Sequence, residues 1–248
     1  MTDTALIVAA GRGIRMGPRG TLTPKGLLKI NDTPLVARSV NLLQAKGVSR
    51  VRIVTGHLAD QYEDIFGTMP GVELVHNPDF ATTGSLRSMM TGLEDLSGPF
   101  VLLESDLIYE TAALAPVLDG PSTILVSGVT GSGDEVYIWT RDETIFDTMS
   151  KKIDAQPRAH FGELTGLSRF DAEDTERLKT AARAVLAEDA KADYEDSVIR
   201  LAQTRDIACT LIPDLAWSEV DTEEMLSRAI GTIWPRIQER DTQLATAG

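Results

Sequence analysis

Short apolar runs alternate with helical spacing through the first hundred residues. The run Leu6 to Ala9 stops at Gly11-Arg12-Gly13, which is typical of a buried strand entering a glycine-rich turn. Apolar spacing then predicts a helix over 34–47, with Thr33 as its N-cap and Pro34 at its first position. The same patterns predict strands at 51–55, 72–75 and 99–104, and helices at 58–66 and 85–96. This alternation with short connections predicts a doubly wound, mostly parallel α/β sheet with helices on both faces.

The pattern changes after Asp106. Two strand-like runs, 123–129 and 135–141, flank the turn 130–134, and together they predict a β-hairpin. Further along, the pattern predicts strands at 162–170 and 207–212, a mostly helical segment at 171–203 and a last helix at 222–230. We therefore expect one domain over 1–248, in which the first half, 1–106, carries the parallel sheet and the second half, 107–248, adds the hairpin region.

Composition narrows the functional classes. The chain has 248 residues, a length that suits one large domain or two small ones. Its 37 acidic residues against 24 Lys and Arg give a net charge of -13, which disfavours nucleic acid and anionic membranes as partners. No apolar run is long enough to span a bilayer, and we expect a cytoplasmic protein. The single Cys209 and three scattered histidines predict neither a disulfide nor a Cys/His metal site.

Positive charge is concentrated near the start of the chain. Residues 1–30 have a net charge of +4, which leaves -17 for the remainder. This segment follows the first strand, where open α/β sheets bind ligands, and its glycines allow backbone N–H groups to approach an anion closely. The pattern predicts a polyphosphate site, and the alternative is a solvated basic loop on an acidic protein.

The spacing of these residues discriminates between phosphate-binding loops. The segment lacks the Gly-Lys-Ser/Thr of an NTPase loop, and its glycines are spaced one residue too far apart for a dinucleotide fold. What is present is Ala9-Ala-Gly-Arg-Gly-Ile-Arg15, eight residues, and then Pro24-Lys25. This resembles the A-A-G-x-G-x-R…P-K loop of nucleotidyltransferases, and implies their Rossmann-like fold. The resemblance continues in Lys25-Gly-Leu-Leu-Lys-Ile, Pro34-Leu, Asp106, 162–166 and Glu219-Val-Asp221.

A second segment indicates a branch of that superfamily. Sugar nucleotidyltransferases tend to carry a Leu-Gly-Thr-Ala-like stretch after the third strand, whereas this chain has Asn77 followed by Ser85-Leu86. That stretch resembles the phosphocholine and 2-aminoethylphosphonate cytidylyltransferases. The resemblance implies attack by an acceptor phosphate or phosphonate oxygen on the α-phosphorus of CTP, release of pyrophosphate, and Mg²⁺ as cofactor.

The resemblance assigns roles at the nucleotide site, most of them in the first half. Lys25 would offset charge at the α-phosphate, Arg15 would hold the β- and γ-phosphates, and Asp106 with Asp221 would hold the Mg²⁺. Each aspartate has an alternative as a turn or helix-cap residue, since Asp favours both. The nucleotide-binding residues would be Ala9, Ala10, Gly11, Gly13 and Ser85.

The second half would bind the acceptor. Lys151 and Lys152 are candidates for its anionic group, although lysine pairs are usually solvated. Glu195 and Asp196, beside Tyr194, are candidates for an ammonium group, and the alternative is the exposed face of a charged helix. Aromatic residues make up only 5% of the chain, which favours an aminoalkyl acceptor over a quaternary amine.

Three functional hypotheses follow. The first is a Mg²⁺-dependent cytidylyltransferase that activates a small phosphate or phosphonate, such as an aminoethylphosphonate- or phosphocholine-like acceptor. The second is a sugar-1-phosphate uridylyl- or thymidylyltransferase. The third is a noncatalytic nucleotide sensor, which would not need both metal carboxylates. The hairpin and helix surface of the second half could also support a homodimer.

Overall fold

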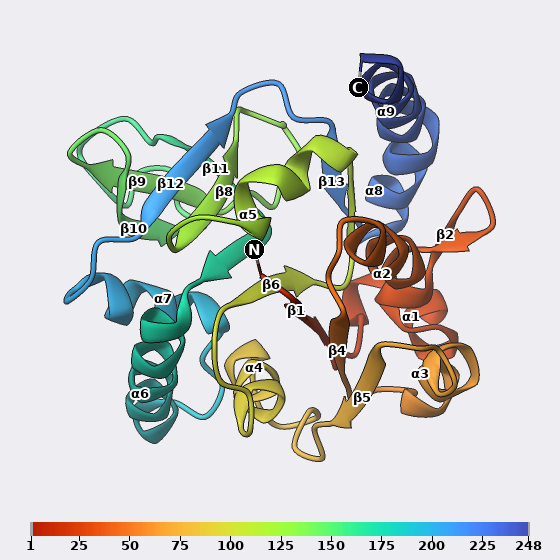
Figure 1. The fold of residues 1–248 in the computed structure, drawn as a ribbon, viewed down its shortest axis with the longest axis horizontal. Helices are drawn as coiled ribbons and strands as arrows, with labels where there is room; N and C mark the ends of the chain where they lie inside the picture. Colours follow the sequence, from red (N-terminus) through yellow and green to blue (C-terminus); the bar gives the residue numbers. More distant parts are fainter. Residues whose placement is uncertain (1, 248) are drawn as a thin grey trace.

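The computed structural model describes residues 2–247, and within them nine strands form one sheet in the order β5-β4-β1-β6-β11-β8-β12-β10-β9 (Figure 1). Two short ladders, β2–β3 and β7–β13, lie outside it. The strands are β1 Thr4–Ala9, β2 Lys29–Ile30, β3 Thr33–Pro34, β4 Arg50–Thr55, β5 Val72–His76, β6 Phe100–Glu104, β7 Leu107–Tyr109, β8 Thr123–Ser127, β9 Tyr137–Arg141, β10 Ile145–Ser150, β11 Gly162–Phe170, β12 Ala208–Ile212 and β13 Trp217–Glu219.

The helices lie between these strands and at the C-terminal end. The α-helices are α1 Pro18–Leu22, α2 Leu35–Ala45, α3 Ala59–Phe66, α4 Ser85–Leu93, α5 Ala115–Leu118, α6 Ala172–Glu188, α7 Tyr194–Ala202, α8 Glu223–Arg228 and α9 Trp234–Ala247. The short helical turns are η1 Ile14–Met16, η2 Lys25–Leu27, η3 Thr111–Leu114 and the π-helical η4 Ala229–Ile233. None of the helices in residues 2–247 is long and apolar enough to cross a membrane.

The first half is the parallel sheet that the sequence predicts. Strands β5, β4, β1 and β6 are all parallel, with Ala5 of β1 opposite Val51 of β4 on one side and Val101 of β6 on the other. Their carboxyl ends therefore meet at one edge. The doubly wound α/β class is confirmed for this half, and the complete sheet is mixed.

The second half extends the sheet through antiparallel strands. Strand β11 runs antiparallel to both β6 and β8, while β12 is parallel to β8. Leu167 pairs with Leu103 of β6, and Glu163 pairs with Ser127 near the end of β8. The beginning of β11 consequently lies beyond the end of β6, at the same edge as the glycine-rich loop.

The predicted hairpin between 123–129 and 135–141 is wrong. Strands β8 and β9 do not pair, because β12 and β10 lie between them in the sheet order, and β9 also pairs with β11. The hairpin of this region joins β9 to β10 through Asp142 and Glu143, both with positive φ. The glycine-rich segment 128–136 is too long for a tight turn and instead leaves the sheet.

Two helix boundaries also differ from the sequence prediction. Helix α2 begins at Leu35, because Thr33 and Pro34 pair with Ile30 and Lys29 in the β2–β3 ladder, so Thr33 is not the N-cap. The helical segment 171–203 is divided into α6 and α7. The break matters for the site, because it places the start of α7 beside the pocket.

Alternation along the strands divides the core between the two faces of the sheet. Leu6 of β1 and Phe100 of β6 pack with α4, α6 and α7, whereas Ile7 and Val101 pack with α2, α3 and α5. A third cluster, which includes Ile108 and Leu226, lies under α8, η4 and α9. Both faces of the parallel sheet are covered, and the carboxyl edge of the strands remains for a ligand.

Candidate active site

The glycine-rich loop folds back on itself at the end of β1. Gly13 has φ +60°, and a Cβ added there would lie 3.1 Å from Cγ of Lys25. A Cβ on Gly20 would come within 2.2 Å of the carbonyl oxygen of Gly13. Only glycine fits these two positions without displacement of the backbone. The tight fold carries Arg15 and Lys25 to the same edge of the sheet.

A pocket of about 530 Å³ lies at this edge, a size suited to small-molecule ligands. Elements of both halves line it: the loop after β1, the end of β6, the start of β11, the start of α7 and β13. Ala9 lies in β1 beneath the loop and is buried rather than exposed to the pocket. The pocket is lined by Ala10, Gly11, Gly13, Arg15, Lys25 and Ser85 of the predicted nucleotide site, together with Asp106, Lys151, Glu195 and Asp221.

Asp106 and Asp221 converge on Lys25. The ammonium of Lys25 contacts the carboxylates of both aspartates, which are themselves buried. Burial lowers the pKa of Lys25, but the carboxylates of Asp106 and Asp221 more than offset this effect, so its pKa lies above the ordinary value. The lysine is therefore fixed as a cation between two carboxylates.

The alternative readings of the two aspartates have different outcomes. Asp106 does occupy the turn between β6 and β7, as a turn residue would. Asp221 is not the cap of α8, because Thr222 takes that role and accepts a hydrogen bond from the backbone N–H of Met225. The side chain of Asp221 is instead directed to Lys25 and Arg15.

Arg15 connects the glycine-rich loop to an acidic cluster. Its guanidinium contacts Asp221 and also Asp134, whose other oxygen accepts a hydrogen bond from Nζ of Lys151 at 2.9 Å. Burial raises the pKa of Asp134, but Arg15 and Lys151 more than compensate, so its pKa lies below the ordinary value. Asp134 is thus ionised and paired with one cation from each half of the chain.

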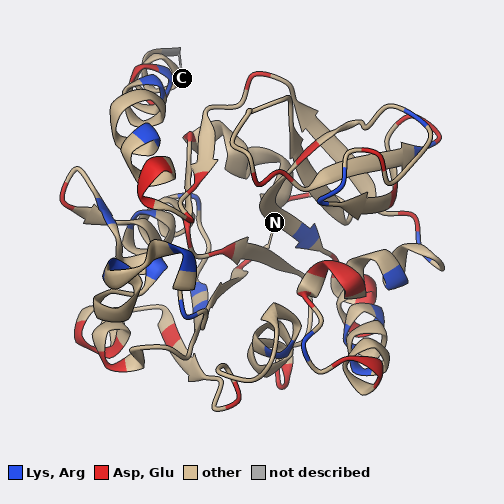
Figure 2. Cartoon of the chain, turned by 180° about the vertical axis from the view of Figure 1, so that it is seen from behind, with Lys and Arg blue, Asp and Glu red and all other residues tan. Residues whose placement is uncertain are grey.

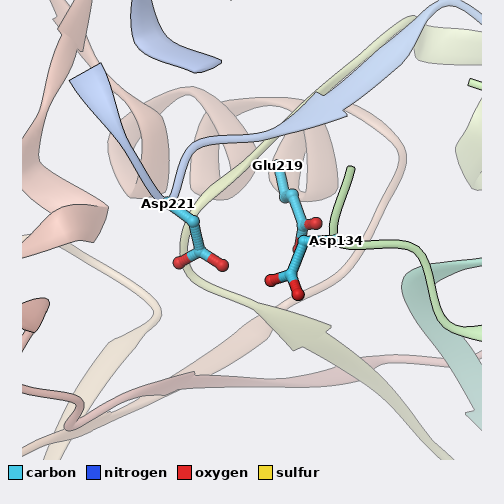
Figure 3. A group of neighbouring side chains, drawn as sticks. All are labelled: Asp134, Glu219 and Asp221. Atoms are coloured by element: carbon cyan, nitrogen blue, oxygen red, sulfur yellow. The ribbon is translucent and has the colours of Figure 1, made fainter. Parts of the chain in front are cut away.

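Three carboxylates meet beside Arg15. Oxygens of Asp134, Glu219 and Asp221 lie within 4.8 Å of one another, and Figure 3 shows Asp221 and Glu219 from the last strand region facing Asp134. Burial, reinforced by Asp106 and Asp221, raises the pKa of Glu219 to about 9. Such a concentration of hard oxygen donors can hold a divalent cation when phosphates complete its coordination.

A second acidic group lies deeper in the pocket. Glu104 accepts a hydrogen bond from the Tyr194 hydroxyl at 2.5 Å, and burial together with Asp106 raises its pKa to about 7. Glu195 follows Tyr194, and burial together with Glu104 raises its pKa to about 8. The Oε2 atom of Glu195 is buried and has no hydrogen-bond partner. A buried acceptor without a donor is costly, so this oxygen is suited to a ligand that brings N–H groups.

Ser85 joins the nucleotide half to this region. Its hydroxyl donates to Asp193 at 2.9 Å and accepts from the backbone N–H of Tyr194 at 3.0 Å. Ser85 begins α4, directly after Gly84, where a Cβ would come within 2.2 Å of the carbonyl oxygen of Ala192. The starts of α4 and α7 are therefore locked together at the pocket.

Two predicted acceptor residues lie outside the pocket lining. Asp196 belongs to the capping box of α7, where it accepts a hydrogen bond from the backbone N–H of Asp193 at 3.1 Å. Lys152 is exposed, one residue beyond Lys151. In each pair only one neighbour lines the pocket, and we do not assign acceptor contacts to the other. Figure 2 shows the acidic first turns of α7 and α8 in red.

Sequence reasoning missed three carboxylates of the site. Asp134 has the sequence context of a turn residue after Gly-Ser-Gly, and Glu104 that of the last residue of a strand. Glu163 lies in the stretch 162–166 that carries part of the family resemblance, but no sequence feature marks this residue itself. It is buried, and its carboxylate accepts hydrogen bonds from the backbone N–H and the hydroxyl of Thr130. No local pattern distinguishes these residues, because their partners are brought to them by other strands.

Comparison with known proteins agrees with this geometry. The model of the MobA-like NTP transferase domain matches residues 5–169. The 2-aminoethylphosphonate cytidylyltransferase of Lancefieldella rimae is 34% identical over 105 residues, which cover 42% of this chain and 43% of that protein. The chain spans about half the length, or less, of the curated relatives that it matches.

Solved structures share the fold over nearly the whole chain. The CTP:phosphocholine cytidylyltransferase of Streptococcus pneumoniae superposes with a TM-score of 0.77 at 20% identity, covering 93% of this chain and 98% of that one. The inositol-1-phosphate CTP transferase of T. maritima gives 0.79 at 16% identity, with coverage of 96% and 97%. From the family match over most of its length and the shared nucleotidyltransferase fold, the chain belongs to the MobA-like NTP transferase domain family.

Proposed function

We propose that this chain is a Mg²⁺-dependent cytidylyltransferase that joins CTP to a small aminoalkyl phosphonate or phosphate and releases pyrophosphate. The observation that carries the proposal is the convergence of Arg15, Lys25, Asp106 and Asp221 at one edge of the pocket. The choice of CTP draws on the curated relatives, which include cytidylyltransferases for 2-aminoethylphosphonate and choline phosphate.

The glycine-rich loop and its two cations would bind the triphosphate. Backbone N–H groups from Gly11 to Gly13 and the guanidinium of Arg15 would hold the β- and γ-phosphates. Lys25 would lie at the α-phosphate, where negative charge is redistributed as the new bond forms. A preorganised donor of this kind lowers the activation free energy by roughly 3 to 4 kcal/mol. Its burial between two carboxylates keeps Lys25 charged and oriented.

The donor set fits Mg²⁺. Asp106 and Asp221 are hard oxygen ligands whose carboxylates already contact one common atom, Nζ of Lys25. Mg²⁺ in nucleotide enzymes commonly takes one or two carboxylates, with phosphate oxygens and waters completing its octahedron. When bound, it would neutralise phosphate charge and so lower the cost of bringing two anions together.

The acceptor would lie toward the second half. Lys151 lines the pocket and can pair with the phosphonate or phosphate oxygens. At the other end of the acceptor, Oε2 of Glu195 has no hydrogen-bond partner and would accept a hydrogen bond from a donor group of the acceptor. A primary ammonium supplies three N–H donors, whereas a quaternary amine supplies none. This difference supports an aminoalkyl acceptor over choline phosphate.

Catalysis by this chain would rest on positioning and charge compensation. The attacking phosphonate or phosphate oxygen is already ionised near neutral pH, so the reaction requires no general base. Arg15 and Lys151 would place the two anions, and Lys25 would stabilise the charge that develops at the α-phosphorus. In-line placement of bound reactants can lower the activation free energy by on the order of 7 to 11 kcal/mol.

A substrate panel tests the proposal. CTP, UTP, dTTP and GTP are each combined with 2-aminoethylphosphonate, choline phosphate, glucose 1-phosphate and inositol 1-phosphate, and pyrophosphate release is measured with Mg²⁺. We expect the highest kcat/KM for CTP with 2-aminoethylphosphonate. Turnover only with UTP or dTTP and the sugar phosphate would establish the sugar nucleotidyltransferase instead. Tight triphosphate binding without turnover on any acceptor would favour the nucleotide sensor.

A further inference from the structure

Asp134 neutralises the two cations that the substrates would need. Its Oδ2 contacts the guanidinium of Arg15, and its Oδ1 accepts a hydrogen bond from Lys151 at 2.9 Å. Arg15 comes from the loop after β1, while Lys151 follows β10. One carboxylate therefore bridges the nucleotide side and the acceptor side of the pocket.

A carboxylate and a phosphate compete for the same donors. Both bind guanidinium and ammonium N–H groups through charge-assisted hydrogen bonds. In the proposed function, on which this inference rests, Arg15 binds the triphosphate and Lys151 binds the acceptor anion. While Asp134 holds both side chains, their N–H groups directed to it are not available to a substrate.

The surroundings of Asp134 favour its release once the cations have other partners. Its carboxylate lies within 4.8 Å of oxygens of Glu219 and Asp221, so it faces two further acidic groups (Figure 3). Glu219, with a pKa of about 9, is uncharged near neutral pH, so the repulsion on Asp134 comes from Asp221, and Arg15 and Lys151 offset it. If phosphates take over the two cations, Asp134 keeps its acidic neighbours and loses its counterions, which makes its position unfavourable.

Hydrogen bonds hold the base of segment 128–136, whereas its tip carries two glycines with positive φ. Its base is fixed, because Thr130 donates to Glu163 from both its N–H and its hydroxyl, and Arg228 donates to the Thr130 carbonyl at 2.7 Å. At its tip, Gly131 and Gly133 have φ of +63° and +90°, with open space beside each. Within the described residues, the ion pairs between this tip and other elements are those of Asp134 with Arg15 and Lys151.

We propose that Asp134 is an internal competitor of the substrates: it holds Arg15 and Lys151 until the phosphates of nucleotide and acceptor displace it. The tip of segment 128–136 then moves away from the pocket on Gly131 and Gly133. The bridging carboxylate lowers the affinity for each anion, and it couples their binding, because the first anion to bind removes one of the two ion pairs that hold Asp134.

Calorimetric titration of the full chain tests this without turnover. Pyrophosphate and methylphosphonate serve as probes of the two cations, and wild type is compared with Asp134→Asn. We expect the variant to bind both probes about five-fold or more tightly, since one competing ion pair is removed for each cation. Asp134→Glu keeps the charge and is expected to stay near wild type.

A matched control removes a similar ion pair elsewhere. Asp147 contacts Arg158 on the surface, and neither residue lines the pocket. Asp147→Asn should therefore leave both affinities unchanged. An equal gain in Asp134→Asn and Asp147→Asn would indicate a nonspecific effect of net charge and would overturn the role of Asp134.

The outcomes separate this inference from the proposed function. If wild type binds pyrophosphate and Asp134→Asn binds it equally or more weakly, Asp134 is no competitor, and a weaker affinity would identify it as a ligand of the substrate or metal. If neither protein binds pyrophosphate, both the inference and the proposed function fail. Binding by the variant alone would support the inference strongly.

Discussion

The carboxylates of Asp106 and Asp221 contact the same lysine ammonium, although one follows β6 and the other follows β13. The proposed metal site and the proposed role of Lys25 both depend on this convergence. It depends on the ladder of β7 with β13, in which Leu107 pairs with Glu219 and so holds the two segments side by side.

The first prediction concerns Lys25. Lys25→Ala should lower kcat by about two to three orders of magnitude, because the lost donor acts on charge that develops in the transition state. The Kd for CTP, measured by calorimetry, should change much less, since Arg15 and the loop amides remain. A large loss of CTP affinity with normal kcat would contradict the role given to Lys25.

The second prediction concerns the metal carboxylates. Asp106→Asn keeps the shape of the side chain and removes its charge, so the dependence of CTP affinity on Mg²⁺ should disappear. Calorimetric titration with CTP, with and without Mg²⁺, measures the effect, and circular dichroism checks that the fold is intact. An unchanged requirement for Mg²⁺ would exclude Asp106 from the metal site.

The third prediction concerns the acceptor anion and uses two adjacent lysines. Lys151 lines the pocket, whereas Lys152 is exposed beyond it. Lys151→Gln should raise the KM for 2-aminoethylphosphonate about ten-fold or more, because a charge-assisted hydrogen bond contributes about 1.5 to 3 kcal/mol. Lys152→Gln is the matched control and should leave this KM unchanged. Equal effects of both substitutions would argue for a diffuse electrostatic role.

The fourth prediction concerns the ammonium end of the acceptor. Glu195→Gln should raise the KM for 2-aminoethylphosphonate and leave the Kd for CTP unchanged. The pKa of Glu195 is raised to about 8, so in wild type this KM should fall as the pH rises through about 8 and the carboxylate forms. The variant should lack this pH dependence. A variant with the wild-type profile would remove Glu195 from acceptor recognition.

The fifth prediction concerns stability without ligands. Burial and Glu104 raise the pKa of Glu195 from 4.5 to about 8, so the folded chain binds the proton more tightly than the unfolded chain. The associated stabilisation is complete below pH 4.5 and is lost as the pH rises through about 8. Glu195→Gln should therefore show a smaller fall in Tm than wild type between pH 5 and 9. Parallel Tm curves for the two proteins would contradict this linkage.

Much of the nucleotide half can be predicted from sequence. Apolar runs predict the strands of the parallel sheet. The spacing of the glycines predicts the loop after the first strand, because a tight backbone turn depends on residues that are close together in the chain. Lys25 and Asp106 were identified because the motif and the strand end are local features. The roles of these residues remain predictions, while their proximity to Asp221 is present in the structure.

Alone, the sequence determined the alternation of strands and helices, the glycine-rich loop and the identity of its cations, because each depends on residues close together in the chain. The tertiary structure decided which strands pair, that Lys151 and Glu195 line the pocket while Lys152 and Asp196 do not, and that Asp134 meets Arg15. These outcomes depend on the order of strands in the sheet and on the rotation of a helix about its axis. Such features are set by packing between distant segments, which leaves no pattern in any one of them.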